Sequence, residues 1–324
     1  MTVTRTARLT GAALCAALAL VIVVWLLRDL AAFGPTTELL WYWAGDHRFR
    51  SARSTATTLV DALLILVYAA TAVAAVRSPL AASAFAVTGL TTLALRLHGL
   101  WTSGVEVLLT TLLTLALAAG LVVTAAAGRR DDGPDTRVGA APGTGTGAGI
   151  AEAPGRPRTG PAVAAGVLCA TAALLWAGWE LRWATLLPAD YTVSRFTGGR
   201  GLMLPALAVP PAWLNTVLVL LLLAAAVSAF ARARPTRPLG LVAGLLLAGV
   251  GAGGAAAVLR PNRHTYTAEQ GLYSVAYDLG CFFSLLAGLA VLVLLARSGH
   301  PRRVPYRPPA ALPPAPPTQP PPGW

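Results

Sequence analysis

Two carboxylic acids stand inside otherwise apolar stretches of the sequence, Asp61 and Asp278. A carboxylate within a membrane-spanning segment is energetically costly, and it is usually paired or exposed to a water-filled cavity. The functional interpretation is therefore a site for an ion, a proton or a substrate. The structural interpretation is a carboxylate at a helix start, where negative charge complements the helix dipole. The sequence leaves both open. Three arginines are candidate partners for each acid: Arg28, Arg53 and Arg96 for Asp61, and Arg182, Arg260 and Arg263 for Asp278.

Arginine is abundant on the side of the membrane that we predict to be extracytoplasmic. Guanidinium groups bind phosphate and carboxylate through paired hydrogen bonds, so this set can bind an anionic solute or a lipid phosphate. The alternative is mutual pairing with acids of the same side. The arginines are Arg28, Arg48, Arg50, Arg53, Arg96, Arg182, Arg195, Arg200, Arg260 and Arg263. The acids are Asp29, Glu38, Asp46, Glu106, Glu180, Asp190 and Glu269.

Metal, cofactor and catalytic motifs are not recognisable in the sequence. His47, His98 and His264 share the predicted outer side, but their loops lack the close spacing typical of zinc ligands. There is no nucleotide-binding loop, no Ser-His-Asp arrangement and no Cys-x-x-Cys motif. We expect no metal and no cofactor, and a non-enzyme is favoured over an enzyme that acts on a lipid phosphate.

The elements that must position these residues are duplicated. Residues 14–28 read LCAALALVIVVWLLR, and residues 168–182 read LCATAALLWAGWELR. Both begin with Leu-Cys-Ala and end with Trp-x-Leu-Arg, at an offset of 154 (168 − 14). Because the second copy lies in the middle of the chain, we interpret the first as a retained helix and not as a cleaved signal peptide.

Further polar residues follow the same duplication. At the offset of 154, Asp61 aligns with Asn215. Residues 48–53 and 195–200 share the pattern R-F-x-x-x-R, and a weaker match relates 96–106 to 260–269. These matches and the two acids define a predicted ligand-binding set: Arg28, Arg48, Arg53, Asp61, Arg96, His98, Glu106, Arg182, Arg195, Arg200, Asn215, Arg260, His264, Glu269 and Asp278.

The composition is that of a polytopic membrane protein, with 56% hydrophobic and 12% charged residues and a mean hydropathy of +0.64. A span requires about 20 mostly apolar residues. We predict an all-α membrane protein with eight transmembrane helices, arranged as two four-helix repeats. Because each repeat has an even number of spans, both have the same orientation. The predicted spans are 9–27, 57–76, 79–97, 105–127, 162–181, 212–231, 239–259 and 273–296.

Four regions follow from these spans. Residues 1–127 and 162–297 are the membrane repeats, 128–161 is a disordered cytoplasmic linker, and 298–324 is a Pro-rich disordered cytoplasmic tail. Fifteen arginines fall on the predicted cytoplasmic side and 10 on the outer side, and one short cytoplasmic turn contains Arg232, Arg234 and Arg237. We therefore expect a plasma-membrane protein with both termini in the cytoplasm. All 25 basic residues are Arg, which is typical of a high-GC, actinobacterial genome.

The net charge of +12 indicates contact with anionic lipid headgroups and not with nucleic acid, since no soluble Arg-rich module is present. We expect an Arg-rich outer face that binds or translocates an anionic solute or lipid. The nearly apolar inner halves of the spans count against translocation. The alternative is a non-catalytic scaffold for envelope assembly or cell division, which binds a protein partner through residues 301–324. G-x-x-x-G spacing at Gly240, Gly244, Gly249 and Gly253 predicts close helix packing, within or between protomers, and the oligomeric state stays open.

Overall fold

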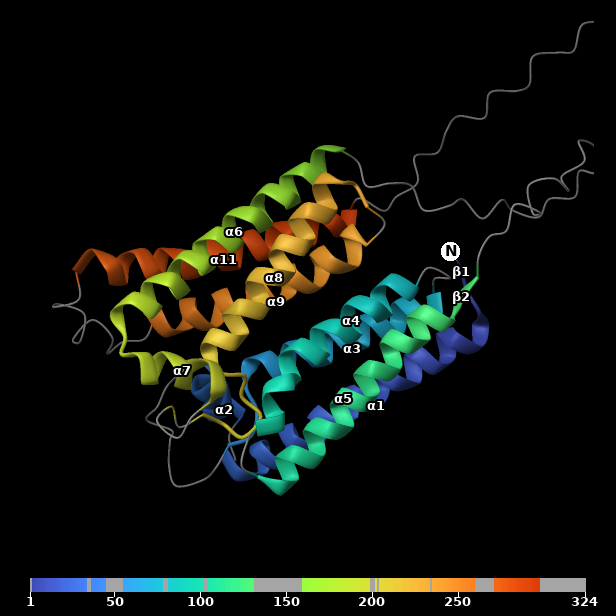
Figure 1. Ribbon diagram of the computed structural model, residues 1–324, viewed down its shortest axis with the longest axis horizontal. Helices are drawn as coiled ribbons and strands as arrows, with labels where there is room; N and C mark the ends of the chain where they lie inside the picture. The colour runs from blue at the N-terminus through green and yellow to red at the C-terminus, as the bar shows by residue number, and fades with distance from the viewer. Residues whose placement is uncertain are drawn as a thin grey trace, which may run out of the picture.

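The computed structural model of the chain is almost entirely helical (Figure 1). The residues it describes are 2–33, 36–44, 55–77, 81–101, 104–130, 159–198, 202, 204–233, 235–259 and 271–297. The predicted linker falls largely on 131–158 and the predicted tail on 298–324, and both lie outside the described residues. Helix α6 begins at Thr159, slightly before the predicted end of the linker.

The first helix group runs from the amino terminus to Ala127. Helix α1 packs against α3 and α5, and α4 packs against α5 and α3. A short helix, α2, follows α1, and a 3₁₀ helix, η2, continues α4. The bounds are α1 (Arg5–Phe33), α2 (Thr36–Trp43), α3 (Leu59–Arg77), α4 (Ala82–Arg96), η2 (Leu97–Trp101) and α5 (Val105–Ala127).

The second helix group contains the long helices α6, α8, α9 and α11. Helix α6 packs against α8 and α11, and α9 packs against α11 and α8. A short helix, α7, follows α6. The bounds are α6 (Thr159–Leu186), α7 (Ala189–Thr197), α8 (Pro211–Phe230), α9 (Thr236–Val258) and α11 (Gly271–Arg297).

Two very short strands tie the amino terminus to the end of the first group. Strand β1 (Thr2–Val3) pairs antiparallel with β2 (Arg129–Arg130). Val3, two residues before α1, is thereby held opposite Arg129, two residues after α5, so the start of α1 and the end of α5 lie at the same end of the molecule (Figure 1).

The two groups meet through α3 and α4 on one side and α8 and α9 on the other (Figure 1). The contacting pairs are α3 with α9, α4 with α9 and α4 with α8. Loop segments add a short backbone ladder, in which Ala206 N donates to Thr55 O (3.0 Å) and Leu207 N donates to Ala56 O (2.9 Å). Trp213 Nε1 also donates to Ala94 O at 2.7 Å, so polar and apolar contacts both join the groups.

Glycines allow the closest helix approaches. A Cβ at Gly240 or Gly244 would meet side chains of α11, whereas a Cβ at Gly249 or Gly253 would meet Leu63 or Leu59 of α3. The predicted G-x-x-x-G positions therefore serve packing within the chain, one pair inside the second group and one pair between the groups.

Seven of the described helices are long and apolar enough to cross a membrane. Their outward side chains include Leu20, Val24 and Leu174, all more than half exposed, as expected for a surface that faces hydrocarbon. The one other predicted span, 79–97, corresponds to α4, which has only 15 residues. The prediction of an all-α membrane protein is thus supported, with seven helices of membrane length among the described residues in place of the predicted eight. The α-helix of the remaining one stops at Arg96, where the chain tightens into η2.

Candidate functional site

All described acidic residues gather at one end of the helix bundle. This end, which we name the carboxylate end, is where α1, α4, α6 and α9 finish and α3, α5, α8 and α11 begin. Its described acids are Asp29, Glu38, Asp61, Glu106, Glu180, Asp190 and Asp278, and its described arginines are Arg28, Arg96, Arg182 and Arg195. The opposite end, which we name the arginine end, carries Arg5, Arg8, Arg77, Arg129, Arg130, Arg232, Arg237 and Arg297, with no acid among its described residues.

Asp61 is buried at the start of α3, with 2% of its surface exposed. Its Oδ2 accepts a hydrogen bond from Thr58 N at 2.7 Å and another from Thr58 Oγ1 at 2.9 Å. A carboxylate at the third helical position that accepts from the N-cap N–H is half of a capping box. The helix-start interpretation therefore describes part of what Asp61 does.

Arg96 supplies the other partner of Asp61. Its Nη2 donates to Asp61 Oδ1, and its Nη1 donates to Leu207 O at 3.1 Å. Arg96 is 4% exposed, so this is a buried ion pair with further hydrogen bonds. Of the three arginines that the sequence offered for Asp61, the structure brings Arg96 to it, and the same guanidinium reaches the second helix group.

Asp29 is a second buried carboxylate, which the sequence suggested only as a pairing acid. It accepts hydrogen bonds from Ala56 N, from Thr57 N at 2.7 Å and from Thr57 Oγ1 at 2.5 Å. It thereby holds the segment that precedes α3. The duplication could not reveal this role, because the residue at the offset of 154 is Trp183.

Hydroxyl groups continue the polar contacts between α3 and α4 deeper into the bundle. Tyr68 OH lies 3.0 Å from Thr92 Oγ1, and Thr71 Oγ1 lies 2.8 Å from Thr88 Oγ1. All four residues are buried. Isolated threonines do not interrupt an apolar span, so nothing in the sequence marked these residues.

The second helix group holds its own polar cluster, centred on Glu180. Glu180 Oε1 accepts from Arg195 Nη2 at 2.9 Å and from Asn215 Nδ2 at 2.5 Å. The Arg195 guanidinium also lies 5.4 Å from the centre of the Trp183 ring. The Glu180 carboxylate thus connects α6 to α7 and α8. Asn215, which aligns with Asp61, contacts Glu180, a residue outside the predicted binding set.

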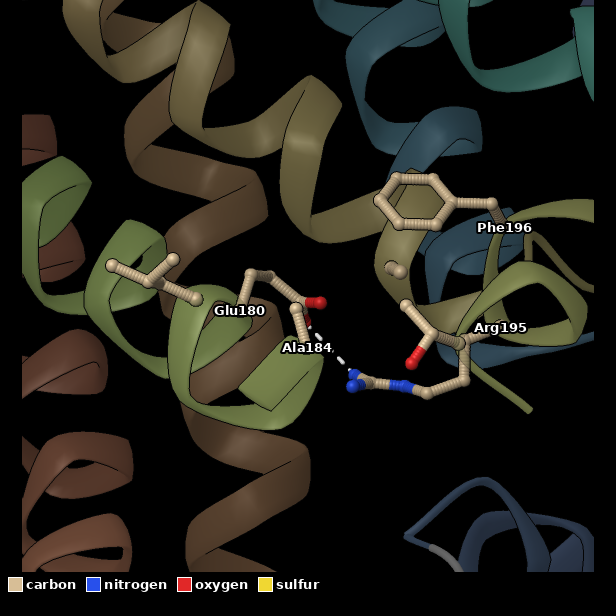
Figure 2. Close-up of a pocket in the computed structure, with 7 residues that line it drawn as sticks. Glu180, Ala184, Arg195 and Phe196 are labelled. Carbon is tan, nitrogen blue, oxygen red and sulfur yellow. Dashed lines mark hydrogen bonds and ion pairs between the residues drawn. The ribbon is translucent and has the colours of Figure 1, made fainter. Parts of the chain in front are cut away.

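A groove opens beside this cluster, with a volume of about 290 Å³. Figure 2 shows Glu180 and Ala184 on α6 facing Arg195 and Phe196 on α7, with the ion pair across the groove. Thr192 Oγ1 is buried in its wall without a hydrogen-bond partner. The lining residues are Glu180, Leu181 and Ala184 of α6, Thr192, Arg195 and Phe196 of α7, and Ala212 of α8.

The remaining described candidates are Arg28, His98, Glu106, Arg182 and Asp278. Arg28 pairs with Glu106 at 2.9 Å in an exposed position. Arg182 lies 3.6 Å from the centre of the Tyr273 ring. His98 is buried, and its Nδ1 donates to Leu95 O at 2.7 Å. Asp278 lies two turns into α11.

Six predicted candidates lie outside the described residues: Arg48, Arg53, Arg200, Arg260, His264 and Glu269. Among the residues that the structure describes, no three His, Cys, Asp or Glu side chains are grouped to hold a metal ion. The described chemistry of the site is therefore that of guanidinium donors, carboxylate acceptors and apolar groove walls.

The fold and the polar clusters define an almost entirely helical, multi-pass membrane protein whose described acids lie at one end of the bundle. No protein-family model matches the chain, and neither a curated protein nor a solved structure is significantly similar to it.

Proposed function

We propose that the protein is a plasma-membrane protein that binds an anionic solute or lipid at an extracytoplasmic carboxylate end. The observation that carries the proposal is Arg195 in the wall of the groove between α6, α7 and α8. Among the described residues it donates one hydrogen bond, from Nη2 to Glu180, so its other N–H groups stay available to oxygen acceptors.

Binding is favoured over translocation because the buried polar groups of α3 and α4 are mostly paired with one another. Asp61 is matched by Arg96, Tyr68 by Thr92 and Thr71 by Thr88. A translocation path needs polar groups that the passing solute can contact, and these contacts leave few such groups along α3 and α4.

The two helix groups are the halves of a duplicated unit in this proposal. The packing order supports it, because the α1–α3, α1–α5, α3–α4 and α4–α5 contacts have counterparts in α6–α8, α6–α11, α8–α9 and α9–α11, although α6 also contacts α9. The contacts between the two groups support it too. If α3 is exchanged for α8 and α4 for α9, the α3–α9 contact becomes the α8–α4 contact. A pseudo-two-fold axis between the groups would give this pattern.

The duplication requires that α4 cross the membrane as the eighth span. Its 15 residues extend about 22 Å, less than the hydrocarbon thickness of about 30 Å. The five residues of η2 add roughly 10 Å at the 3₁₀ rise. Helix α4 and η2 together therefore have the length that one crossing needs.

The charge distribution supports an orientation with both termini in the cytoplasm. Described residues of the arginine end include eight arginines and no acid, against four arginines and seven acids at the carboxylate end. Positively charged residues near helix ends favour the cytoplasmic side. The carboxylate end, with the groove, then faces outward.

The proposal is tested by adding anionic probes to the purified full chain in phosphatidylcholine nanodiscs. Inorganic phosphate and phosphatidylglycerol are the two probes, and the thermal unfolding midpoint is measured. Because a ligand that binds the folded state stabilises it, at least one probe should raise the midpoint. Arg195→Gln should reduce this rise, and Arg232→Gln, at the arginine end, should not. No rise with either probe, or a rise lost only in Arg232→Gln, would contradict the proposal.

A further inference from the structure

The groove between α6, α7 and α8 offers both kinds of hydrogen-bonding group. Arg195 supplies N–H donors, and the Thr192 hydroxyl, buried and without a partner, can donate or accept. Both described hydrogen bonds of Glu180 fall on Oε1, which leaves Oε2 as an acceptor. The Arg195–Glu180 ion pair has no net charge. A matching ligand therefore presents acceptor oxygens to Arg195 and a hydrogen-bond donor to Glu180.

The rest of the wall is apolar. Leu181, Ala184, Phe196 and Ala212 line it, and Leu181 is 69% exposed. The groove lies near the end of α6, where the partly exposed aromatic residues Trp183 and Tyr191 also lie. Trp and Tyr are enriched at the depth where hydrocarbon meets headgroups. A ligand at this depth has a polar and an apolar part.

We propose that the groove is a phospholipid site that selects headgroups carrying N–H or O–H donors. The inference rests on the proposed function and narrows its ligand to a lipid. The lipid phosphate accepts hydrogen bonds from Arg195 and Thr192, and the headgroup donates to Glu180 Oε2. A volume of about 290 Å³ holds only part of a lipid. The acyl chains therefore continue from the groove along exposed apolar residues such as Leu181.

The selectivity follows from hydrogen-bond capacity. Phosphatidylglycerol carries hydroxyl donors and phosphatidylethanolamine carries an ammonium, whereas the choline group of phosphatidylcholine has no N–H or O–H. A tenfold change in affinity corresponds to about 1.4 kcal/mol, which lies within the roughly 1–3 kcal/mol lost when a buried acceptor is left without a donor. We therefore expect phosphatidylcholine to bind about tenfold more weakly than the other two lipids.

Native mass spectrometry of the detergent-purified full chain tests the site. Ala184→Phe fills the groove from α6 and should weaken phosphatidylglycerol binding about tenfold or more. Its matched control is Ala177→Phe, which places the same side chain at an exposed position of α6 outside the groove. Thr192→Val, which keeps the shape and removes the hydroxyl, should weaken binding several-fold. Elution as a monodisperse peak checks that each variant folds.

The outcomes separate this inference from the proposed function. If phosphate or phosphatidylglycerol stabilises the wild type while Ala184→Phe binds lipid like Ala177→Phe, the proposed function stands and the groove is not the lipid site. Equal affinities for phosphatidylcholine and phosphatidylglycerol would overturn the headgroup selectivity. If the wild type responds to neither anionic probe, the proposed function itself fails.

Discussion

Three described arginines of the predicted binding set pair with carboxylates, and the pairs differ sharply in exposure. The side chains of Arg96 and Asp61 are 5% and 2% exposed, whereas those of Arg28 and Glu106 are 57% and 73% exposed. A buried pair has lost its hydration, so removing one partner leaves a charge with little compensation. An exposed pair is screened by water and contributes little.

Asp61→Asn is expected to destabilise the protein strongly, because it leaves the Arg96 guanidinium buried without a countercharge. Breaking a buried pair in this way typically costs about 3–5 kcal/mol. Chemical or thermal unfolding of the purified chain in detergent measures the effect. Glu106→Gln is the matched control on the exposed pair, with an expected loss of about 0–1 kcal/mol. Equal losses in the two variants would mean that Asp61 and Arg96 are not a buried pair.

The sequence predicted part of this residue-scale chemistry. It offered Arg96 as one of three partners for Asp61, because both residues lie near the predicted outer boundary of spans in one repeat. It did not find the pairing of Glu180 with Arg195 and Asn215, since these residues come from three separate helices. Distances along the chain say little about which helix ends converge, so only the packing of α6, α7 and α8 could reveal that cluster.

At the scale of elements, α9 and α11 approach each other closely at small residues. A Cβ at Gly288 would lie 2.5 Å from Ala248 N and 2.6 Å from Gly244 O, both backbone atoms of α9. A backbone cannot move aside as a flexible side chain can. Small residues are the usual means by which membrane helices approach so closely.

Gly288→Ala should therefore force α9 and α11 apart and lower the unfolding midpoint markedly, as overpacking typically costs about 1–3 kcal/mol. The control is Gly178→Ala on α6, where a Cβ would meet nothing within 4 Å. This control should be neutral or slightly stabilising, since Ala is the better helix former by about 1 kcal/mol. A Gly288→Ala variant as stable as Gly178→Ala would contradict the close packing.

The long helices could be predicted from hydropathy alone, but two kinds of element could not. Helices α2 and α7 have 8 and 9 residues, so a search for membrane-length apolar stretches passes over them. The change from α4 to η2 after Arg96 could not be predicted either, because Leu97 is as apolar as the leucines of α4. These short elements are the ones that position Arg195 and end α4 at Arg96.

At the scale of the whole molecule, charge is divided between two ends. The carboxylate end holds every described acid, and its arginines contact carboxylates or aromatic rings. The arginine end holds exposed Arg5, Arg77, Arg237 and Arg297 without a described acid. An excess of positive charge at one end of a membrane protein favours the cytoplasmic side for that end.

The central claim, that the carboxylate end faces outward, is tested most directly by cysteine labelling. Cys15, Cys169 and Cys281 are buried and form no disulfide, and they would first be replaced by Ala. Asp190→Cys then reports on the carboxylate end and Ala231→Cys on the arginine end, since both positions are exposed. In intact spheroplasts, a membrane-impermeant maleimide should label Asp190→Cys and not Ala231→Cys, and permeabilisation should make both reactive. Labelling of Ala231→Cys alone in intact spheroplasts would place the groove in the cytoplasm and contradict the account.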